Sequence, residues 1–211
     1  MTVAIIDYGM GNVRSVARAL EHVGAMKVLI TDNLAELREA DRLVFPGQGA
    51  IASCFSHIRD HGLAEELGNL LRSKPVLGIC LGLQALFDFS EEDGGVAGLG
   101  LIPGRVERFP AGMIDGGERA KIPQMGWNRV TQHSAHPLWH GIPDAAWFYF
   151  VHSYYASAAD DNNRSGICQY GDVEFTAAAA RENIFAVQFH PEKSHRDGLQ
   201  LLRNFLSWDG T

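Results

Sequence analysis

The chain has few of the features that mark several large classes of protein. Its 211 residues include only three cysteines, Cys54, Cys80 and Cys168, which are widely separated and odd in number. Because they match neither a disulfide framework nor a zinc-ligand pattern, we expect a protein of a reducing, cytoplasmic compartment. No apolar run reaches the length of a membrane span. The N-terminus reaches Asp7 without a basic segment, so it is interpreted as a first strand and not as a signal peptide.

Positive charge is also scarce. The chain has 18 lysines and arginines against 25 aspartates and glutamates, a net charge of −7, and the basic residues form no cluster. We therefore expect neither nucleic acid nor an anionic membrane as a partner. His133, His136 and His140 lie close together, but their segment carries Pro137 and no cysteine or carboxylate, so no metal site is expected. No cofactor is expected either, because phosphate-binding loops and nucleotide fingerprints are absent.

The hydrophobic pattern of the first half alternates between two periods. Short apolar strands are predicted at 3–6, 27–30, 42–45 and 75–77, and the third is expected to break at Pro46-Gly47. Between them, helices are predicted at 12–23, 34–40, 50–59 and 63–72. Strands that alternate with helices indicate a parallel sheet covered on both faces.

The second half has few helices between its apolar segments. Strands are predicted at 101–109, 128–131, 147–151, 165–170, 175–180 and 184–189, and a closing helix at 196–208. The whole chain, 1–211, is therefore predicted to form one α/β domain, as its length favours. Its sheet is expected to be open and mostly parallel, with helices on both faces and antiparallel additions in the C-terminal half.

The strongest chemical signal is the segment Gly78-Ile79-Cys80-Leu81-Gly82, which joins an apolar strand to a helix-like stretch. Small residues on both sides suit a tight, strained turn in which a Cβ would clash. Such a turn holds the thiol above the sheet at a helix N-terminus, which favours the nucleophilic thiolate. A cysteine after a buried strand is more often a small core residue, which we expect of Cys54 and Cys168. The turn alone does not decide whether Cys80 is a nucleophile or a small core residue.

A possible base for this thiol is His190, which follows the apolar strand 186–189. Ligands collect at the carboxyl ends of strands in a parallel sheet, which is the edge where Cys80 is expected. Glu192 lies just beyond Pro191 and can accept a hydrogen bond from the imidazole, which would fix its tautomer. A lone histidine at a strand end is usually solvated. Paired with the turn at Cys80, however, it favours a Cys80, His190 and Glu192 triad.

Two backbone amides are expected to stabilise an oxyanion near Cys80. One is that of Leu81, directly after the nucleophile, and the other comes from the loop after the third strand. This loop is Pro46-Gly47-Gln48-Gly49-Ala50, and Gly47, Gln48 and Gly49 are its candidate donors. Its glycines allow the backbone to approach a ligand or to turn an amide toward it.

Together, Gly78 to Gly82, the Pro46-Gly47-x-Gly49 loop and His190-Pro191-Glu192 resemble the class I (triad) glutamine amidotransferases. The resemblance runs from about Ile5 to Phe205 and implies a flavodoxin-like fold. It implies further that Cys80 opens glutamine through a thioester, releasing ammonia and then glutamate, and that Gln84, Ser153 and Tyr154 hold the substrate. Gln48 departs from the aliphatic residue that is more usual at its position.

Four further segments, 7–12, 123–128, 149–154 and 190–194, resemble one branch of this family, which supplies ammonia for histidine biosynthesis. That branch implies a heterodimer with a separate (β/α)8-barrel cyclase subunit. The candidate docking residues are Tyr8, Gly9, Asn12, Gln124, Met125, Trp127 and Asn128, and on composition alone Trp127 could equally be core.

Three other readings remain. The chain could serve anthranilate or pyridoxal phosphate synthesis, against which segment 124–128 argues. It could also be a stand-alone cysteine hydrolase, or a non-catalytic interaction module, against which the intact triad argues.

Overall fold

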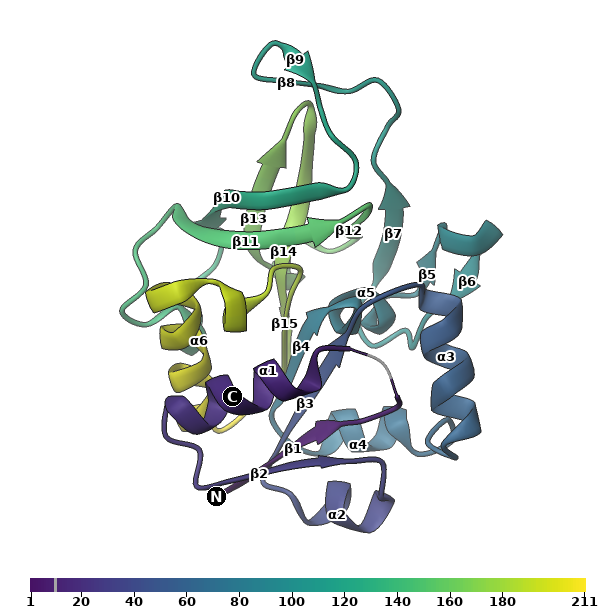
Figure 1. The fold of residues 1–211 in the computed structure, drawn as a ribbon, viewed down its shortest axis with the longest axis vertical. Helices are drawn as coiled ribbons and strands as arrows, with labels where there is room; N and C mark the ends of the chain where they lie inside the picture. Colours follow the sequence, from purple (N-terminus) through teal and green to yellow (C-terminus); the bar gives the residue numbers. More distant parts are fainter. Residues whose placement is uncertain (10) are drawn as a thin grey trace.

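The structure, a computed structural model, describes residues 1–9 and 11–211 and is built around one large sheet (Figure 1). Its N-terminal half contributes four parallel strands in the spatial order β2-β1-β3-β4. They are β1 (Thr2–Ile6), β2 (Lys27–Thr31), β3 (Arg42–Gly47) and β4 (Val76–Cys80). This arrangement confirms the predicted α/β class, in which strands are buried on both faces.

Helices cover both faces of this parallel half, and the alternation along β1 shows how. Val3 and Ile5 pack into a core shared with α1 (Val13–His22) and α6 (His195–Ser207). Ala4 and Ile6 face the opposite core, which holds the buried residues of α2 (Leu34–Glu39), α3 (Ile51–Asp60), α4 (Leu67–Ser73) and α5 (Leu81–Leu86). Among the described residues, none of the helices combines the length and the apolar character that crossing a bilayer requires.

The C-terminal half adds mainly antiparallel strands to the same sheet (Figure 1). Its longer strands are β7 (Gly104–Arg108), β10 (Gln124–Gln132), β11 (Ala146–His152), β12 (Tyr154–Ala158), β13 (Arg164–Tyr170), β14 (Val173–Arg181) and β15 (Ile184–Val187). Its two-residue strands are β5 (Phe89–Ser90), β6 (Val96–Ala97) and the separate hairpin β8 (Ile114–Asp115) and β9 (Glu118–Arg119).

Two of the longer strands of the second half, β7 and β15, do not follow the antiparallel prediction on both sides, since β7 pairs parallel with β5. β15 pairs antiparallel with β14 but parallel with β4, so it joins the two halves of the sheet. Its register sets Val187 beside Ile79, which brings the segment after β15 to the edge where β4 ends.

Several predicted boundaries differ from the structure. β3 does not break at Pro46-Gly47, because its pairing with β4 continues until Gly47 lies beside Cys80. α4 begins at Leu67, four residues later than predicted. β10 is longer than predicted. Most of its residues are exposed or half-exposed, so the sequence shows no apolar run over its full length. The unpredicted β12 begins with two tyrosines but ends in Ala156, Ser157 and Ala158, which carry little strand signal.

Candidate active site

Cys80 lies at the end of β4 in a backbone conformation that a side-chain-bearing residue rarely adopts. Its φ is 56° and its ψ is −109°, and α5 begins at the next residue. Gly82 makes this turn possible, since a Cβ there would overlap the carbonyl oxygen of Phe45 on β3. The predicted strand, sharp turn and helix are therefore present, and they hold the thiol at the carboxyl edge of the sheet.

His190 and Glu192 meet at the same edge. The Nδ1 of His190 lies 2.9 Å from the Oε1 of Glu192, and both side chains are almost fully buried. His190 follows β15, and Glu192 lies in the short helix η4 (Pro191–Lys193). Ser194 steadies this turn, because its hydroxyl donates to the carbonyl of His190 and accepts the amide of Tyr149.

The protonation state of the His190 and Glu192 pair is set by opposing effects on the pKa of His190. Burial lowers the pKa of its imidazole, but the neighbouring Cys80 and Glu192 outweigh burial and raise that pKa to about 10. Since Nδ1 faces Glu192, the other ring nitrogen, Nε2, is left without a hydrogen-bond partner among the described residues. The arrangement can therefore hold an imidazolium beside a thiolate and can hand on its Nε2 proton.

A cavity of about 320 Å³ opens in front of Cys80. The expected site residues that line it are Gln48, Gly49, Cys80, Leu81, Gln84, Ser153, Tyr154 and His190. Gln84 is fixed in its wall, because its amide nitrogen donates to the carbonyl of Tyr154 at 2.9 Å and to Gln188 Oε1 at 3.0 Å. Gly47 lies beneath this surface instead of lining it, and a Cβ there would come within 2.8 Å of the Leu81 Cβ.

Two buried residues close to Cys80 or its cavity went unnoticed in the sequence. Gln188 is fully buried and directs its amide nitrogen at the Cys80 sulfur, 3.7 Å away. His152 lines the cavity with its Nδ1 bonded to the carbonyl of Tyr154, and burial, with a smaller effect of His190, lowers its pKa to about 4. A polar residue inside the apolar strand 186–189 is a signal that would have found Gln188.

Glu92, which is half-buried, is a further residue at this cavity that the sequence did not reveal, and it comes from η1 (Glu92–Gly94). Its carboxylate lines the cavity and accepts the backbone amide of Ile51 at 2.9 Å. Burial raises the pKa of Glu92. Nothing in the acidic stretch 91–95 sets this carboxylate apart from its neighbours, so the sequence offers no signal for it.

The expected docking residues divide into buried and exposed groups. Tyr8 and Gln124 are 0% and 3% exposed, which corrects their expected place on a partner-facing surface. Met125 and Trp127 are 65% and 42% exposed, Gly9 is exposed, and Asn12 and Asn128 are partly so. Met10, which belongs to the same motif, lies outside the described residues.

Trp127 is a surface residue and not part of the core. Its ring stacks on His195 with centroids 4.8 Å apart and meets Tyr149 edge-on at 6.0 Å. It also lines a second cavity of about 300 Å³ with Met125 and Asn128. A large aromatic ring held in the open in this way is typical of an interface anchor.

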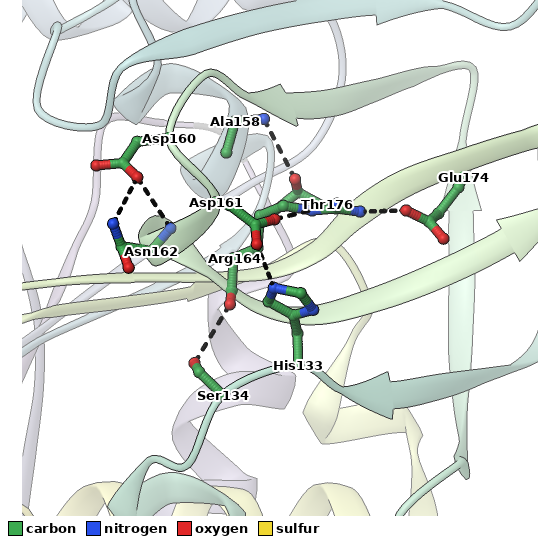
Figure 2. Close-up of polar contacts among 9 residues, drawn as sticks. All are labelled: His133, Ser134, Ala158, Asp160, Asp161, Asn162, Arg164, Glu174 and Thr176. Atoms are coloured by element: carbon green, nitrogen blue, oxygen red, sulfur yellow. Dashed lines mark hydrogen bonds and ion pairs between the residues drawn. The ribbon is translucent and has the colours of Figure 1, made fainter.

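The three neighbouring histidines do not converge. His133 pairs through Nε2 with Asp161 at 2.9 Å, and Arg164 links Asp161 to Glu174 (Figure 2). His136 instead packs against Phe185 and Trp208, and burial lowers its pKa to about 4. Among residues 1–9 and 11–211, no three His, Cys, Asp or Glu side chains are grouped as metal ligands.

The other two cysteines are structural in character. Cys54 and Cys168 are 0% and 2% exposed, and neither lines the cavity at Cys80. Burial raises the pKa of Cys54 to about 11 and that of Cys168 to about 12, so both stay protonated at neutral pH.

Comparisons with known proteins agree with this geometry. Residues 4–208 match the family model described as glutamine amidotransferase class-I. The chain is 56% identical over 209 residues to "Imidazole glycerol phosphate synthase subunit HisH" of Pseudomonas savastanoi pv. phaseolicola, covering 99% of this chain and 98% of that protein. Its identity to the protein of the same name from Dechloromonas aromatica is 53%, covering 98% and 96% of the two chains.

Solved structures share the fold at lower identity. A structure titled glutamine amidotransferase superposes with a TM-score of 0.71 at 18% identity and covers 97% of both chains. A putative GMP synthase protein from Thermoplasma acidophilum gives a TM-score of 0.69 at 20% identity, covering 98% of this chain and 92% of that one.

Proposed function

The chain belongs to the class-I glutamine amidotransferase family, and on that premise we propose that it is the glutaminase subunit of imidazole glycerol phosphate synthase. It hydrolyses glutamine to glutamate and ammonia for histidine biosynthesis. The observation that carries this proposal is the buried His190 and Glu192 pair beside Cys80, at a cavity of about 320 Å³. The high identity to relatives of that name gives independent support.

The reaction begins with attack of the Cys80 thiolate on the side-chain carboxamide carbon of glutamine. The resulting oxyanion is stabilised by the amide of Leu81 and by one from the Gly47 to Gly49 segment. His190 gives its Nε2 proton to the departing nitrogen, the carbon–nitrogen bond breaks, and ammonia leaves a γ-glutamyl thioester. Loss of one oxyanion donor would lower the rate by about 100-fold or more.

The second half of the reaction returns the enzyme to its starting state. Neutral His190 takes a proton from water, and the hydroxide equivalent attacks the thioester carbon. The carbon–sulfur bond then breaks, glutamate leaves, and the thiolate is again paired with an imidazolium. Glu192 keeps the ring oriented throughout, and Gln84 with the backbone of Ser153 and Tyr154 holds the substrate.

Ammonia that escaped into water would be protonated and lost to the second reaction. We propose that this chain passes it directly to a (β/α)8-barrel cyclase subunit in a heterodimer. The exposed residues Gly9, Asn12, Met125, Trp127 and Asn128 are the candidate docking surface. Trp127 is its expected anchor, because its ring is large, exposed and held by His195.

The loop Pro46 to Ala50 is proposed to act as a switch between resting and active states. Its glycines allow a peptide to turn its amide toward the oxyanion. The rate of glutamine hydrolysis would then depend on whether the cyclase subunit has bound the molecule that accepts the ammonia. Ammonia release, measured with and without the liganded cyclase subunit, tests this directly, and equal rates would rule the switch out.

The assignment of Cys80 is tested in the complex with the cyclase subunit. Cys80→Ala should abolish product formation from glutamine but leave product formation from added ammonium salt at the wild-type rate. Cys168→Ala removes another buried thiol that does not line the cavity, and it should keep both activities. Persistence of glutamine-dependent product in Cys80→Ala would refute the role of Cys80.

The same assays separate the alternatives. A stand-alone cysteine hydrolase would turn over glutamine or another amide at full rate without a partner. A branch that serves anthranilate or pyridoxal phosphate synthesis would fail to support the cyclase. A non-catalytic module would form no covalent adduct with a glutamine-like electrophile. Mass spectrometry of the Cys80 peptide shows whether the adduct has formed.

A further inference from the structure

Tyr8 is a fully buried residue whose hydroxyl supports the loop next to Cys80. The hydroxyl donates to the carbonyl of Pro46 at 2.7 Å, and the ring meets Phe45 edge-on at 5.8 Å. The same oxygen lies so close to Gly47 that a Cβ there would be 2.5 Å from it. The phenol therefore touches the end of β3 at Pro46 and at Gly47, the first of the candidate oxyanion donors.

The far end of this loop is held by a different side chain. The amide of Ile51, the first residue of α3, donates to the Oε2 of Glu92. Gly47 is in addition paired with Cys80 in the ladder between β3 and β4. With both ends held, the residues that remain exposed and able to reorient are Gln48 and Gly49.

Tyr8 is also the chain neighbour of Gly9, one of the candidate docking residues. The amide of Gly9 donates to the Oδ1 of Asp7 at 3.0 Å, which fixes the chain direction on either side of Tyr8. Gly11 lies near the same loop, since a Cβ on Gly11 would be 3.7 Å from the Cα of Gly47. Gly9 is thus exposed, while its neighbour Tyr8 touches the oxyanion loop.

We propose that Tyr8 is a positioning residue for the oxyanion loop, which holds the Gly47 to Gly49 amides in register with Leu81 and couples them to Gly9, its exposed neighbour in the chain. This inference rests on the proposed function, because it concerns the donors used during glutamine hydrolysis. Tyr8 does not contact the substrate. Its effect is on the transition state, where the loop amide is needed, and only weakly on the binding of glutamine.

The first test compares Tyr8→Phe with Tyr155→Phe in the full chain, both without a partner and with the liganded cyclase subunit. Both variants remove a hydroxyl from a buried tyrosine, but that of Tyr155 bonds Glu107 on β7. We expect Tyr8→Phe to lower kcat for glutamine about tenfold and to change KM less than twofold, since a displaced oxyanion donor is lost mainly from the transition state. It should also reduce stimulation by the partner. Tyr155→Phe should match the wild type in kcat, in KM and in stimulation by the partner.

A second measurement separates positioning from a general loss of structure. Alkylation of Cys80 by iodoacetamide needs the thiolate but no oxyanion donor, so Tyr8→Phe should react at the wild-type rate, as followed by mass spectrometry. If Tyr8→Phe keeps the wild-type kcat, or loses kcat and the rate of alkylation in parallel, the proposed role of Tyr8 is wrong. Either result would leave the proposed function untouched. Absence of glutamine turnover in the wild-type complex would instead overturn the proposed function, and this inference with it.

Discussion

The amide nitrogen of Gln188 lies 3.7 Å from the sulfur of Cys80, and both side chains are buried. Its carbonyl oxygen accepts the amide of Gln84, so the orientation of the Gln188 side chain is fixed. An N–H group directed at the sulfur can donate a hydrogen bond to it during the reaction. The segment that follows β15 therefore provides both the base, His190, and a donor for the nucleophile.

Gln188→Leu should lower kcat for glutamine about tenfold, because a hydrogen bond to a charged group is worth about 1.5–3 kcal/mol. Gln84 would also lose one of its two acceptors, so the urea midpoint of unfolding should fall. Steady-state kinetics and urea titration of the purified chain measure both effects. Gln200→Leu, on α6, is the control and should leave kcat unchanged. An unaltered kcat in Gln188→Leu would show that the thiolate does not depend on this donor.

The pH dependence of turnover should change when Glu192 is replaced. Burial lowers the pKa of His190, and Cys80 and Glu192 together raise it to about 10. Glu192→Gln removes one of the two groups that raise the pKa of His190, so the imidazolium loses its proton at lower pH. The alkaline limb of the kcat/KM profile should move downward in pH, and kcat should fall about 100-fold or more through loss of ring orientation. A profile that keeps its alkaline limb would contradict the pairing.

The two helical glycines Gly82 and Gly68 should respond in opposite directions to alanine. In Gly82→Ala the new Cβ would overlap the Phe45 carbonyl, so we expect loss of turnover and a loss of stability of about 3 kcal/mol or more. In Gly68→Ala, on α4, the nearest atom is the flexible end of Arg72 at 3.2 Å, and stability should rise by about 0.5 kcal/mol. Thermal unfolding measures both, and a stable Gly82→Ala would refute the packing argument.

Acid should destabilise the fold partly through His136. Burial lowers its folded-state pKa to about 4, while an unfolded histidine titrates near 6.5. Between these values the unfolded chain binds more protons, so the free energy of unfolding falls as pH drops from about 6.5 toward 4. Its Nδ1 also accepts the amide of Leu138, a bond that protonation removes.

His136→Asn keeps an acceptor for that amide but does not titrate. Compared with the wild type, it should lose less unfolding free energy between pH 7 and pH 5, with a difference of up to about 2 kcal/mol. Urea titrations at the two pH values give the comparison. Equal losses in the two proteins would mean that His136 contributes nothing to acid sensitivity.

Trp127→Ala should lower the affinity for the cyclase partner about 30-fold, since a buried aromatic anchor contributes about 2 kcal/mol to an interface. Isothermal titration with the purified partner measures this change. Met26→Ala is the control, because Met26 is 84% exposed but lies before β2, at the amino end of the strands. Equal affinities for all three proteins would place the interface elsewhere.

The α/β architecture was predictable because its strands are apolar on both faces and its helices are amphipathic. The turn at Cys80 was predictable for a different reason, since glycine at positions 78 and 82 is a chemical requirement of the tight turn. β12 could not be predicted in the same way. Its small residues, such as Ala156 and Ala158, acquire their extended conformation from pairing with β7 and not from intrinsic preference.

Tertiary contacts also decided which site residues were missed. His152 owes its place at the cavity to strand pairing between β10 and β11, which no local pattern encodes. Tyr8 was placed among the docking residues because segment 7–12 resembles one branch of the family. The structure turns the phenol inward because its hydroxyl finds an acceptor at Pro46, 38 residues along the chain.

The position of β15 has a consequence for the time at which activity arises. β15 is the final strand along the chain, yet it lies between β4 and β14 in the middle of the sheet. During synthesis the nucleophile emerges more than a hundred residues before its base, and the gap beside β4 stays open until β15 enters it. A nascent chain therefore carries the thiol without its base until β15 has paired with β4.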